Sequence, residues 1–267
     1  MTGVDAVLAF GETPARSRDP HHVRTLVERQ GAAILTGWGT SPDHAVEAAH
    51  AIFGDDVLQA PLPSEVRAGG DRDRRLPSID HTTPLPPHTD GFAYGDRYPD
   101  YFLLSCAHAS PEGGESFLVD GEAVVDHLAG RPGGRDIVQR LQDVAVDQTE
   151  PGMQRSVTPV IGRTVAGRLM LRRFPYQRPA DDSADPVRDG AMIDAWRDAI
   201  ATAAAAAPRF KLRAGDVVVV DNYRMMHGRE AYADLDRLMW RVWVWTTAAF
   251  GVPGGPLHSD SRYASAT

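Results

Sequence analysis

The stretch Pro87-His88-Thr89-Asp90-Gly91 carries the signal that decides the fold. Residues two apart in an extended strand point to the same side, so His88 and Asp90 can face one metal ion while Thr89 turns away. Imidazole and carboxylate groups are common ligands of divalent metal ions. The triplet therefore predicts a strand that presents two metal ligands on one face.

A third ligand has to come from another part of the chain, and His227 is the best candidate. It follows the apolar run 217–220 and the segment 221–226, which places it just beyond a predicted strand. Two histidines and one carboxylate form the facial triad of non-haem Fe(II) oxygenases, which leaves coordination positions open. Taken alone, a His-x-Asp triplet also fits a surface turn with a capping aspartate and a core histidine.

Short apolar runs bounded by turn residues dominate the chain beyond Pro87. The predicted strands occupy 101–106, 116–119, 157–161, 168–173, 210–212, 217–220 and 239–246. We expect the third and fourth of these to form a hairpin, and the fifth and sixth to pair around the turn 213–216. The predicted helices occupy 121–128, 136–144 and 192–206. This pattern predicts a mainly β fold with flanking helices, a double-stranded β-helix or jelly roll.

The N-terminal part has clear helix signals. Asp19-Pro20 predicts the start of a helix over 21–30, and Ser41-Pro42 the start of another that ends near Phe53. A short strand is expected between them at 32–35. We expect a single oxygenase-type domain over 1–267, with a helical part at 1–60 and a jelly-roll core at about 85–250.

Two stretches rich in Pro, Gly and Asp, 61–87 and 175–190, are expected to be loops. Loops of this length in a compact domain are usually lids or disordered segments. We expect them to be lids that order over the site when substrate binds.

Composition and charge narrow the class of protein. The formal net charge is -8 and no block of basic residues is present, which disfavours nucleic acid as a partner. No apolar stretch is long enough to cross a membrane, and the first residues lack the pattern of a secretory signal. The single cysteine, Cys106, allows no intramolecular disulfide. These features predict a cytoplasmic protein without a membrane partner.

Six blocks of sequence resemble a known family in their order and spacing. They are Leu85-Pro86-Pro87-His88-Thr89-Asp90, Leu104-Ser105-Cys106, Glu112-Gly113-Gly114-Glu115-Ser116, Val119-Asp120-Gly121, Asp221-Asn222-Tyr223-Arg224-Met225-Met226-His227-Gly228-Arg229 and Arg237-Leu238-Met239-Trp240-Arg241. This pattern resembles the taurine dioxygenase superfamily of Fe(II)/2-oxoglutarate-dependent oxygenases, in its gamma-butyrobetaine hydroxylase and clavaminate-synthase-like branch. The resemblance implies Fe(II) at His88, Asp90 and His227, with 2-oxoglutarate and O₂ as co-substrates.

The resemblance also implies a site for the far carboxylate of 2-oxoglutarate. In similar enzymes an arginine shortly after the distal histidine binds this group, because its planar fork matches a carboxylate. Arg237 is the preferred candidate, since Asp236-Arg237-Leu238 resembles the family's step, and Arg241 is the alternative. Ser116 is expected to assist, in the place where the family commonly has threonine. Gly113 and Gly114 would permit a close approach of the chain.

The resemblance also implies a small-molecule substrate. We expect a polar metabolite such as an amino acid or a biosynthetic intermediate. Arg172 or Arg173, beside a predicted strand, is a candidate for binding a substrate carboxylate. Hydroxylation is the expected outcome, and desaturation, epoxidation or cyclisation are alternatives. Related halogenases lack the metal-binding carboxylate, so Asp90 argues against halogenation.

Two other classes of protein fit these residues less well than an oxygenase does. A metal-binding jelly roll without catalysis would have no use for an arginine after His227. A zinc hydrolase is disfavoured because no His-Glu-x-x-His helix is present. The aromatic group of Trp240, Trp243 and Trp245 is expected to be core packing.

Overall fold

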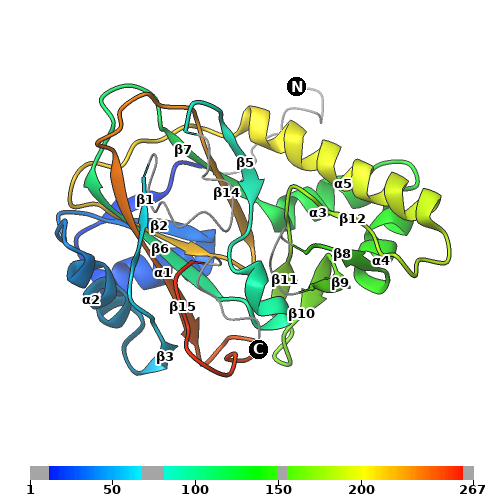
Figure 1. The fold of residues 1–267 in the computed structure, drawn as a ribbon, viewed down its shortest axis with the longest axis horizontal. Helices are drawn as coiled ribbons and strands as arrows, with labels where there is room; N and C mark the ends of the chain where they lie inside the picture. Colours follow the sequence, from blue (N-terminus) through cyan, green and yellow to red (C-terminus); the bar gives the residue numbers. More distant parts are fainter. Residues whose placement is uncertain (1–11, 68–80, 150–154, 261–267) are drawn as a thin grey trace.

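The computed structural model describes residues 12–67, 81–149 and 155–260 (Figure 1). Its N-terminal part consists of β1 (Ala15–Ser17), α1 (Pro20–Gln30), β2 (Ala32–Leu35) and α2 (Pro42–Phe53). Both helices begin at the predicted caps: Asp19 accepts a hydrogen bond from the backbone N–H of His21, and Ser41 accepts one from that of His44. The helix and strand predictions for this part are therefore confirmed.

The larger sheet has seven strands in the order β1-β2-β13-β6-β15-β3, and β4 also pairs with β15. Its other members are β13 (Val217–Asp221), β6 (Tyr101–His108), β15 (Leu238–Thr246), β3 (Val57–Gln59) and β4 (Ser64–Val66). The run of four valines in β13 is buried on both faces of the sheet. Val217 and Val219 pack with α1 and α2 on the outside, whereas Val218 and Val220 face the interior.

The smaller sheet has the order β5-β14-β7, with β5 (Leu85–His88), β14 (Met225–Arg229) and β7 (Ser116–Asp120). Leu118 and Met225 pack into the interior with residues of the larger sheet, so the two sheets face each other. Phe117, Val119 and Met226 point the other way, towards α3 (Gly121–Ala129), α4 (Gly134–Asp143) and α5 (Pro186–Ala206). The predicted jelly roll with flanking helices is confirmed, and the metal ligands lie where the sheets face each other.

Five short strands form further small sheets: β8 (Ala145–Asp147), β9 (Val157–Pro159), β10 (Ile161–Arg163), β11 (Leu169–Leu171) and β12 (Arg178–Pro179). Of the two short 3₁₀ turns, η1 (Gly54–Asp56) joins α2 to β3, and η2 (Phe92–Arg97) precedes β6. The predicted hairpin exists as β10 paired with β11, whereas β9 pairs with β8. The strand expected at 157–161 is thus two strands with different partners.

Two predictions for the C-terminal half were wrong. Residues 210–212 do not pair with β13: Phe210 bridges Ser116 instead, and β13 lies between β2 and β6. The long helix starts at Pro186 rather than Met192, because Asp185 caps it by accepting a hydrogen bond from the backbone N–H of Arg188.

The two predicted loops are therefore shorter than expected. The second loses residues to β12 and to the start of α5. The first contains β4 and leads into β5, and its part at 68–80 lies outside the described residues. Their role as lids stays a prediction.

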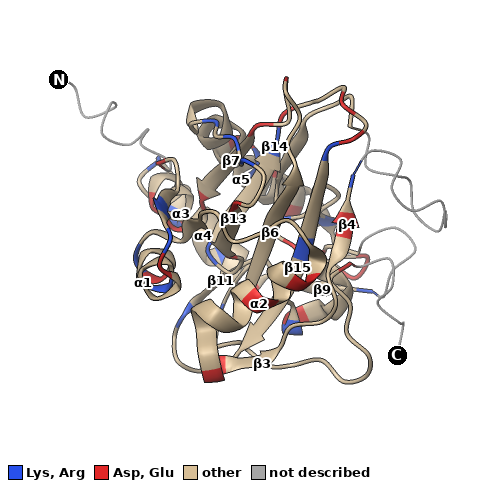
Figure 2. Ribbon diagram, turned by 90° about the vertical axis from the view of Figure 1, so that its left-hand side faces the viewer, with Lys and Arg blue, Asp and Glu red and all other residues tan. Residues whose placement is uncertain are grey.

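Within the described ranges, no helix is long and apolar enough to cross a membrane. Lys and Arg are interspersed with Asp and Glu along the helices and strands of this part of the chain (Figure 2).

Candidate metal centre

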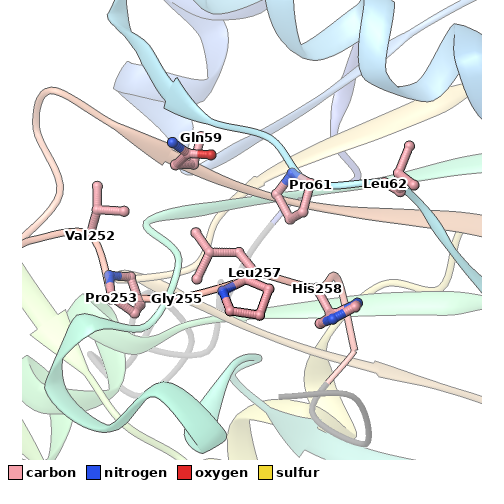
Figure 3. Close-up of a pocket in the computed structure, with 9 residues that line it drawn as sticks. Gln59, Pro61, Leu62, Val252, Pro253, Gly255, Leu257 and His258 are labelled. Atoms are coloured by element: carbon pink, nitrogen blue, oxygen red, sulfur yellow. The ribbon is translucent and has the colours of Figure 1, made fainter. Parts of the chain in front are cut away.

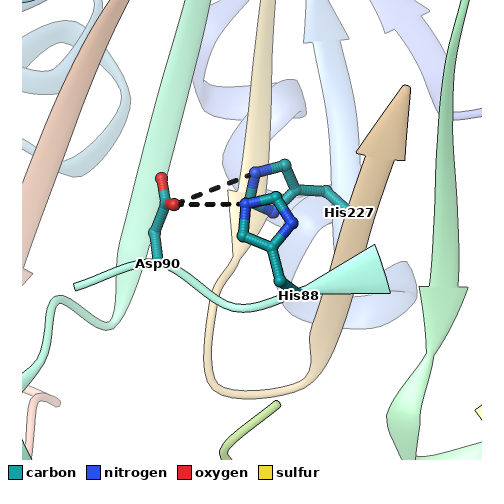
Figure 4. Close-up of side chains that lie close together, drawn as sticks. All are labelled: His88, Asp90 and His227. Atoms are coloured by element: carbon teal, nitrogen blue, oxygen red, sulfur yellow. Dashed lines mark ion pairs between the residues drawn. The ribbon is translucent and has the colours of Figure 1, made fainter. Parts of the chain in front are cut away.

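The three predicted ligands converge at one point between the sheets (Figure 4). His88 ends β5, Asp90 follows two residues later, and His227 lies on the neighbouring strand β14 directly opposite His88. Nε2 of His88 is 3.6 Å from Oδ1 of Asp90, and Nε2 of His227 is 4.0 Å from the same oxygen. The pairing of β5 with β14 therefore brings together residues far apart in the sequence.

The protonation states of these side chains suit metal binding. The Nδ1–H of His88 donates to the carbonyl oxygen of Pro86 over 3.0 Å, which leaves the lone pair on Nε2. Burial, aided by the neighbouring His88, lowers the pKa of His227 to about 3, so its imidazole is neutral. Burial alone would raise the pKa of Asp90, but Arg241, His88 and His227 together hold it well below its usual range.

The arrangement fits a divalent transition metal. One ligand atom from each residue lies within 4.8 Å of the other two. Ligands at right angles around a metal with bonds of about 2.1 Å lie about 3 Å apart, so small side-chain movements would complete the site. His227 Nδ1 is buried without a hydrogen-bond partner among the described residues, and its ring packs between His88 and Phe102 at centroid distances of 4.1 and 4.3 Å. The ring is thus held by packing with one polar edge towards Asp90.

Two residues of β15 hold the carboxylate of Asp90 from the larger sheet. The indole Nε1–H of Trp243 donates to Oδ2 over 2.8 Å, and Nη1 of Arg241 lies 3.4 Å from each carboxylate oxygen. Trp243 is 1% exposed and packs in the core as predicted, but its bond to Asp90 was not foreseen. Arg241 therefore contacts Asp90, one of the three predicted metal ligands.

The backbone of Asp90 is fixed by Asn222, which is fully buried. The side-chain Oδ1 accepts from the N–H of Asp90 over 2.9 Å, and Nδ2 donates to the carbonyl oxygens of Asp90 and Pro99 over 3.0 and 2.8 Å. Asn222 precedes β14, which carries His227, so one amide ties the two ligand-bearing segments together.

Arg237 lies immediately before β15 and is 4% exposed. Its guanidinium stacks over the ring of Tyr232 at 4.7 Å, and its Nη1 has no hydrogen-bond partner within the described part of the chain. Burial raises the pKa of the Cys106 thiol to about 11, and the positive charge of Arg237 limits this rise. The Nη1 group of this buried guanidinium can therefore donate hydrogen bonds to an anion.

One glycine of the third sequence block, Gly114, lies close to Arg237. Gly114 has a φ of 70°, and a Cβ there would lie 3.1 Å from Nε of Arg237. Two residues on, Ser116 shares a strand face with Leu118, which packs into the interior. Among the described contacts, no hydrogen bond joins the Ser116 hydroxyl to Arg237.

Arg172 and Arg173 are both buried and held by protein atoms. Arg172 forms an ion pair of 2.9 Å with Asp96 and donates to the carbonyl oxygen of Pro159 over 3.0 Å. Nη1 of Arg173 donates to the carbonyl oxygen of Phe174 and lies 3.3 Å from the side-chain oxygen of Gln177. No described contact links either guanidinium to the metal ligands.

A cavity of about 340 Å³ lies between the β3–β4 connection and the segment that follows β15 (Figure 3). Its walls include Gln59, Leu62, Val252 and His258. None of the three metal ligands lines it, so it is separate from the metal centre.

The chain matches the family described as "Taurine catabolism dioxygenase TauD, TfdA family" over residues 8–243. It therefore belongs to this family, and the superfamily predicted from the six sequence blocks is confirmed. The protein is an oxidoreductase of the dioxygenase class that depends on iron and 2-oxoglutarate. A search of curated protein sequences finds no match. The branch within the superfamily stays a prediction.

Several solved structures share the fold. Asparagine oxygenase (AsnO) is similar with a TM-score of 0.65 and 19% identity, over 90% of this chain and 84% of that one. PvcB of Pseudomonas aeruginosa has a TM-score of 0.58 and 18% identity, over 85% and 79%. The non-heme iron oxygenase OrfP, in complex with Fe and alpha-ketoglutaric acid, has a TM-score of 0.56 and 18% identity, over 85% and 79%.

Proposed function

We propose that His88, Asp90 and His227 bind one Fe(II) ion, and that the protein uses 2-oxoglutarate and O₂ to hydroxylate an unactivated C–H bond of a small polar metabolite. The convergence of one ligand atom from each residue within 4.8 Å is the observation that supports this most directly. When bound, iron and 2-oxoglutarate supply the oxidation, coupled to decarboxylation of 2-oxoglutarate. The chain's residues bind and orient the reactants.

Arg237 binds the far carboxylate of 2-oxoglutarate in this proposal, with Ser116 beside it. A buried guanidinium without a carboxylate partner is costly, and a bound carboxylate would offset that cost. Arg237 has no ion pair among the described residues, whereas Arg241 lies near the carboxylates of Asp90 and Asp260. This difference favours Arg237, and Arg241 is the alternative.

An amino acid or related biosynthetic intermediate is the proposed substrate class. Two proteins of similar fold were solved with such molecules: asparagine oxygenase with 3-hydroxyasparagine and succinate, and OrfP with (3S)-hydroxy-L-Arg. We assign substrate binding to Arg172 or Arg173. Arg172 is the better of the two, since its partner Asp96 is about half exposed and can release it.

Other outcomes on the same centre are desaturation, epoxidation and cyclisation. A metal-binding jelly roll without catalysis is the second candidate function. Arg237, buried without an ion pair in the described part of the chain, argues against it. We further propose that the whole chain forms one oxygenase domain and that the protein works in the cytoplasm. The single, buried thiol of Cys106 suits a reducing compartment.

The experiment is a succinate-release assay with Fe(II), 2-oxoglutarate and a panel of amino acids and small carboxylates. We expect one class of substrate to stimulate succinate release, and mass spectrometry to show a product that has gained one oxygen. His88→Ala should abolish both signals. Two results would contradict the proposal: succinate release that persists in His88→Ala, or no succinate release by the original protein with any added metal.

A further inference from the structure

The chain beyond β15 folds back against the metal centre. Ser259 and Asp260 are 1% and 5% exposed, although they follow a long irregular segment. They lie beside the part of β15 that carries Arg241 and Trp243, between the places where β3 and β4 pair with that strand. Figure 3 shows the preceding residues of this segment, including Leu257 and His258, close to Pro61 and Leu62.

Residues 259 and 260 contact the two residues of β15 that hold Asp90. The carbonyl oxygen of Ser259 accepts from Nε of Arg241 over 2.8 Å, and its hydroxyl oxygen accepts from the backbone N–H of Trp243 over 3.1 Å. Oδ2 of Asp260 lies 3.5 Å from Nη2 of Arg241. Arg241 is therefore anchored through Nε, and its two other nitrogens lie between the carboxylates of Asp90 and Asp260.

The segment is itself fastened at several points. The backbone N–H of His258 donates to the hydroxyl of Tyr94 over 2.8 Å, and Ser64 donates to the carbonyl oxygen of Ser259 over 2.8 Å. Tyr94 packs edge-on against Trp243 and Trp245. These contacts come from η2, β4 and β15, so the segment is held from several directions.

We propose that Ser259 and Asp260 are positioning residues of the metal centre, acting through Trp243 and Arg241 on the carboxylate of Asp90. The proposal rests on the proposed role of Asp90 as a metal ligand. Nη1 of Arg241 is 3.4 Å from both oxygens of Asp90, well beyond the 2.7–2.9 Å or so of a strong charge-assisted hydrogen bond. Asp260 and the Ser259 carbonyl hold the guanidinium at this distance, which leaves the carboxylate lone pairs for the metal.

Loss of either contact should weaken metal binding for a distinct reason. Without the carboxylate of Asp260, the guanidinium of Arg241 would pair with Asp90 alone. It would then compete with the metal for the carboxylate oxygens of Asp90. Without the hydroxyl of Ser259, the backbone N–H of Trp243 would lose its acceptor and the indole would hold Asp90 less firmly. Changes to residues that orient metal ligands typically cost about 10- to 100-fold in metal affinity.

The test is titration of the metal-free protein with Co(II), followed by visible absorption. Ser259→Ala and Asp260→Asn should each bind Co(II) about tenfold more weakly, while Ser259→Thr, which keeps the hydroxyl, should bind as tightly as the original protein. Ser17→Ala and Asp194→Asn are matched controls and should leave the affinity unchanged. The hydroxyl of Ser17 bonds the backbone of Asp19 near the start of α1, and Asp194 forms an exposed ion pair with Arg197. Thermal unfolding of each metal-free variant separates loss of affinity from loss of fold.

The outcomes distinguish this inference from the function on which it rests. Wild-type affinity in both Ser259→Ala and Asp260→Asn, with binding lost in His227→Ala, would overturn the inference and leave the triad intact. Equal losses in Ser17→Ala and Ser259→Ala would also overturn it, because a general effect of removing a serine hydroxyl would then explain both. If the original protein binds Co(II) equally well after His227→Ala, the proposed triad itself is wrong.

Discussion

The indole Nε1 of Trp243 lies 2.8 Å from Oδ2 of Asp90 and donates a hydrogen bond to it. Trp243 belongs to the larger sheet, whereas Asp90 follows β5 of the smaller sheet. The bond therefore joins the two sheets at the point where the metal ligands converge. Together with Arg241 of the same strand, this core side chain orients the carboxylate of Asp90.

Trp243→Phe should lower metal affinity by about tenfold, because Asp90 would lose a buried donor that orients it. The change also leaves a buried carboxylate oxygen short of a partner, at about 1–3 kcal/mol. Trp240→Phe is the matched control, since its indole donates to the carbonyl oxygen of Thr40 elsewhere on the same strand. Calorimetric titration with a divalent metal measures the effect, and equal affinities in the two variants would refute it.

Arg237→Ala should raise the KM for 2-oxoglutarate by about 30-fold or more, since truncating one partner of a buried charged pair costs about 2 kcal/mol or more. Arg163→Ala is the control, because Arg163 is exposed and, among the described residues, its side chain donates a hydrogen bond to the carbonyl oxygen of Gly167 alone. Steady-state kinetics with 2-oxoglutarate varied provide the measurement. An unchanged KM in Arg237→Ala, with a raised KM in Arg241→Ala, would transfer the role to Arg241.

Gly114→Ala should weaken 2-oxoglutarate binding through Arg237. The added methyl would lie 3.1 Å from Nε of Arg237, so the guanidinium has to shift. Gly133→Ala is a close control: its φ of 73° matches the 70° of Gly114, but nothing lies within 4 Å of the new methyl. Both variants should lose about 1 kcal/mol of stability from backbone strain. Only Gly114→Ala should change the co-substrate KM, and parallel behaviour of the pair would contradict the assignment.

The sequence was most informative where local geometry determines the outcome. Residues two apart in a strand point to the same side, which correctly placed His88 and Asp90 together. The cap residues Asp19 and Ser41 correctly marked two helix starts. The signal Asp185-Pro186 has the same form and does start α5. It was missed because it sits in a Pro- and Asp-rich stretch that resembles a loop.

Features that depend on distant partners could not be predicted in this way. Phe210 pairs with Ser116 and not with the strand next to it in sequence, because tertiary contacts decide strand partners. Three hydrogen bonds near the metal centre join segments more than ten residues apart. They run from Trp243 to Asp90, from the backbone of Asp90 to Asn222, and from Arg241 to Ser259. Their residue types carry no local sign of a role at a metal centre.

Arg168→Met should destabilise the fold by about 3–5 kcal/mol, because it leaves buried carboxylates without their partner. Arg168 forms ion pairs of 3.0 Å with Asp100 and 2.8 Å with Asp221. Urea unfolding measures the loss, and Arg197→Met, at an exposed ion pair, should cost less than about 1 kcal/mol.

The loss in Arg168→Met should also depend on pH. Burial raises the pKa of Asp100 and of Asp221, while Arg168 opposes this rise. Without Arg168 both folded-state pKa values should rise further, so the folded state of the variant binds protons more tightly than the unfolded state. Its stability therefore falls as pH rises through these pKa values, and the deficit should be smaller at about pH 5 than at about pH 8. A deficit that does not change with pH would contradict this.

We expect His88, Asp90 and His227 to hold one iron ion, which anomalous diffraction from crystals grown anaerobically with Fe(II) would locate. A single peak should lie about 2.0–2.2 Å from Nε2 of His88, Nε2 of His227 and a carboxylate oxygen of Asp90. A peak that is not ligated by His227, or no peak between these three side chains, would contradict it.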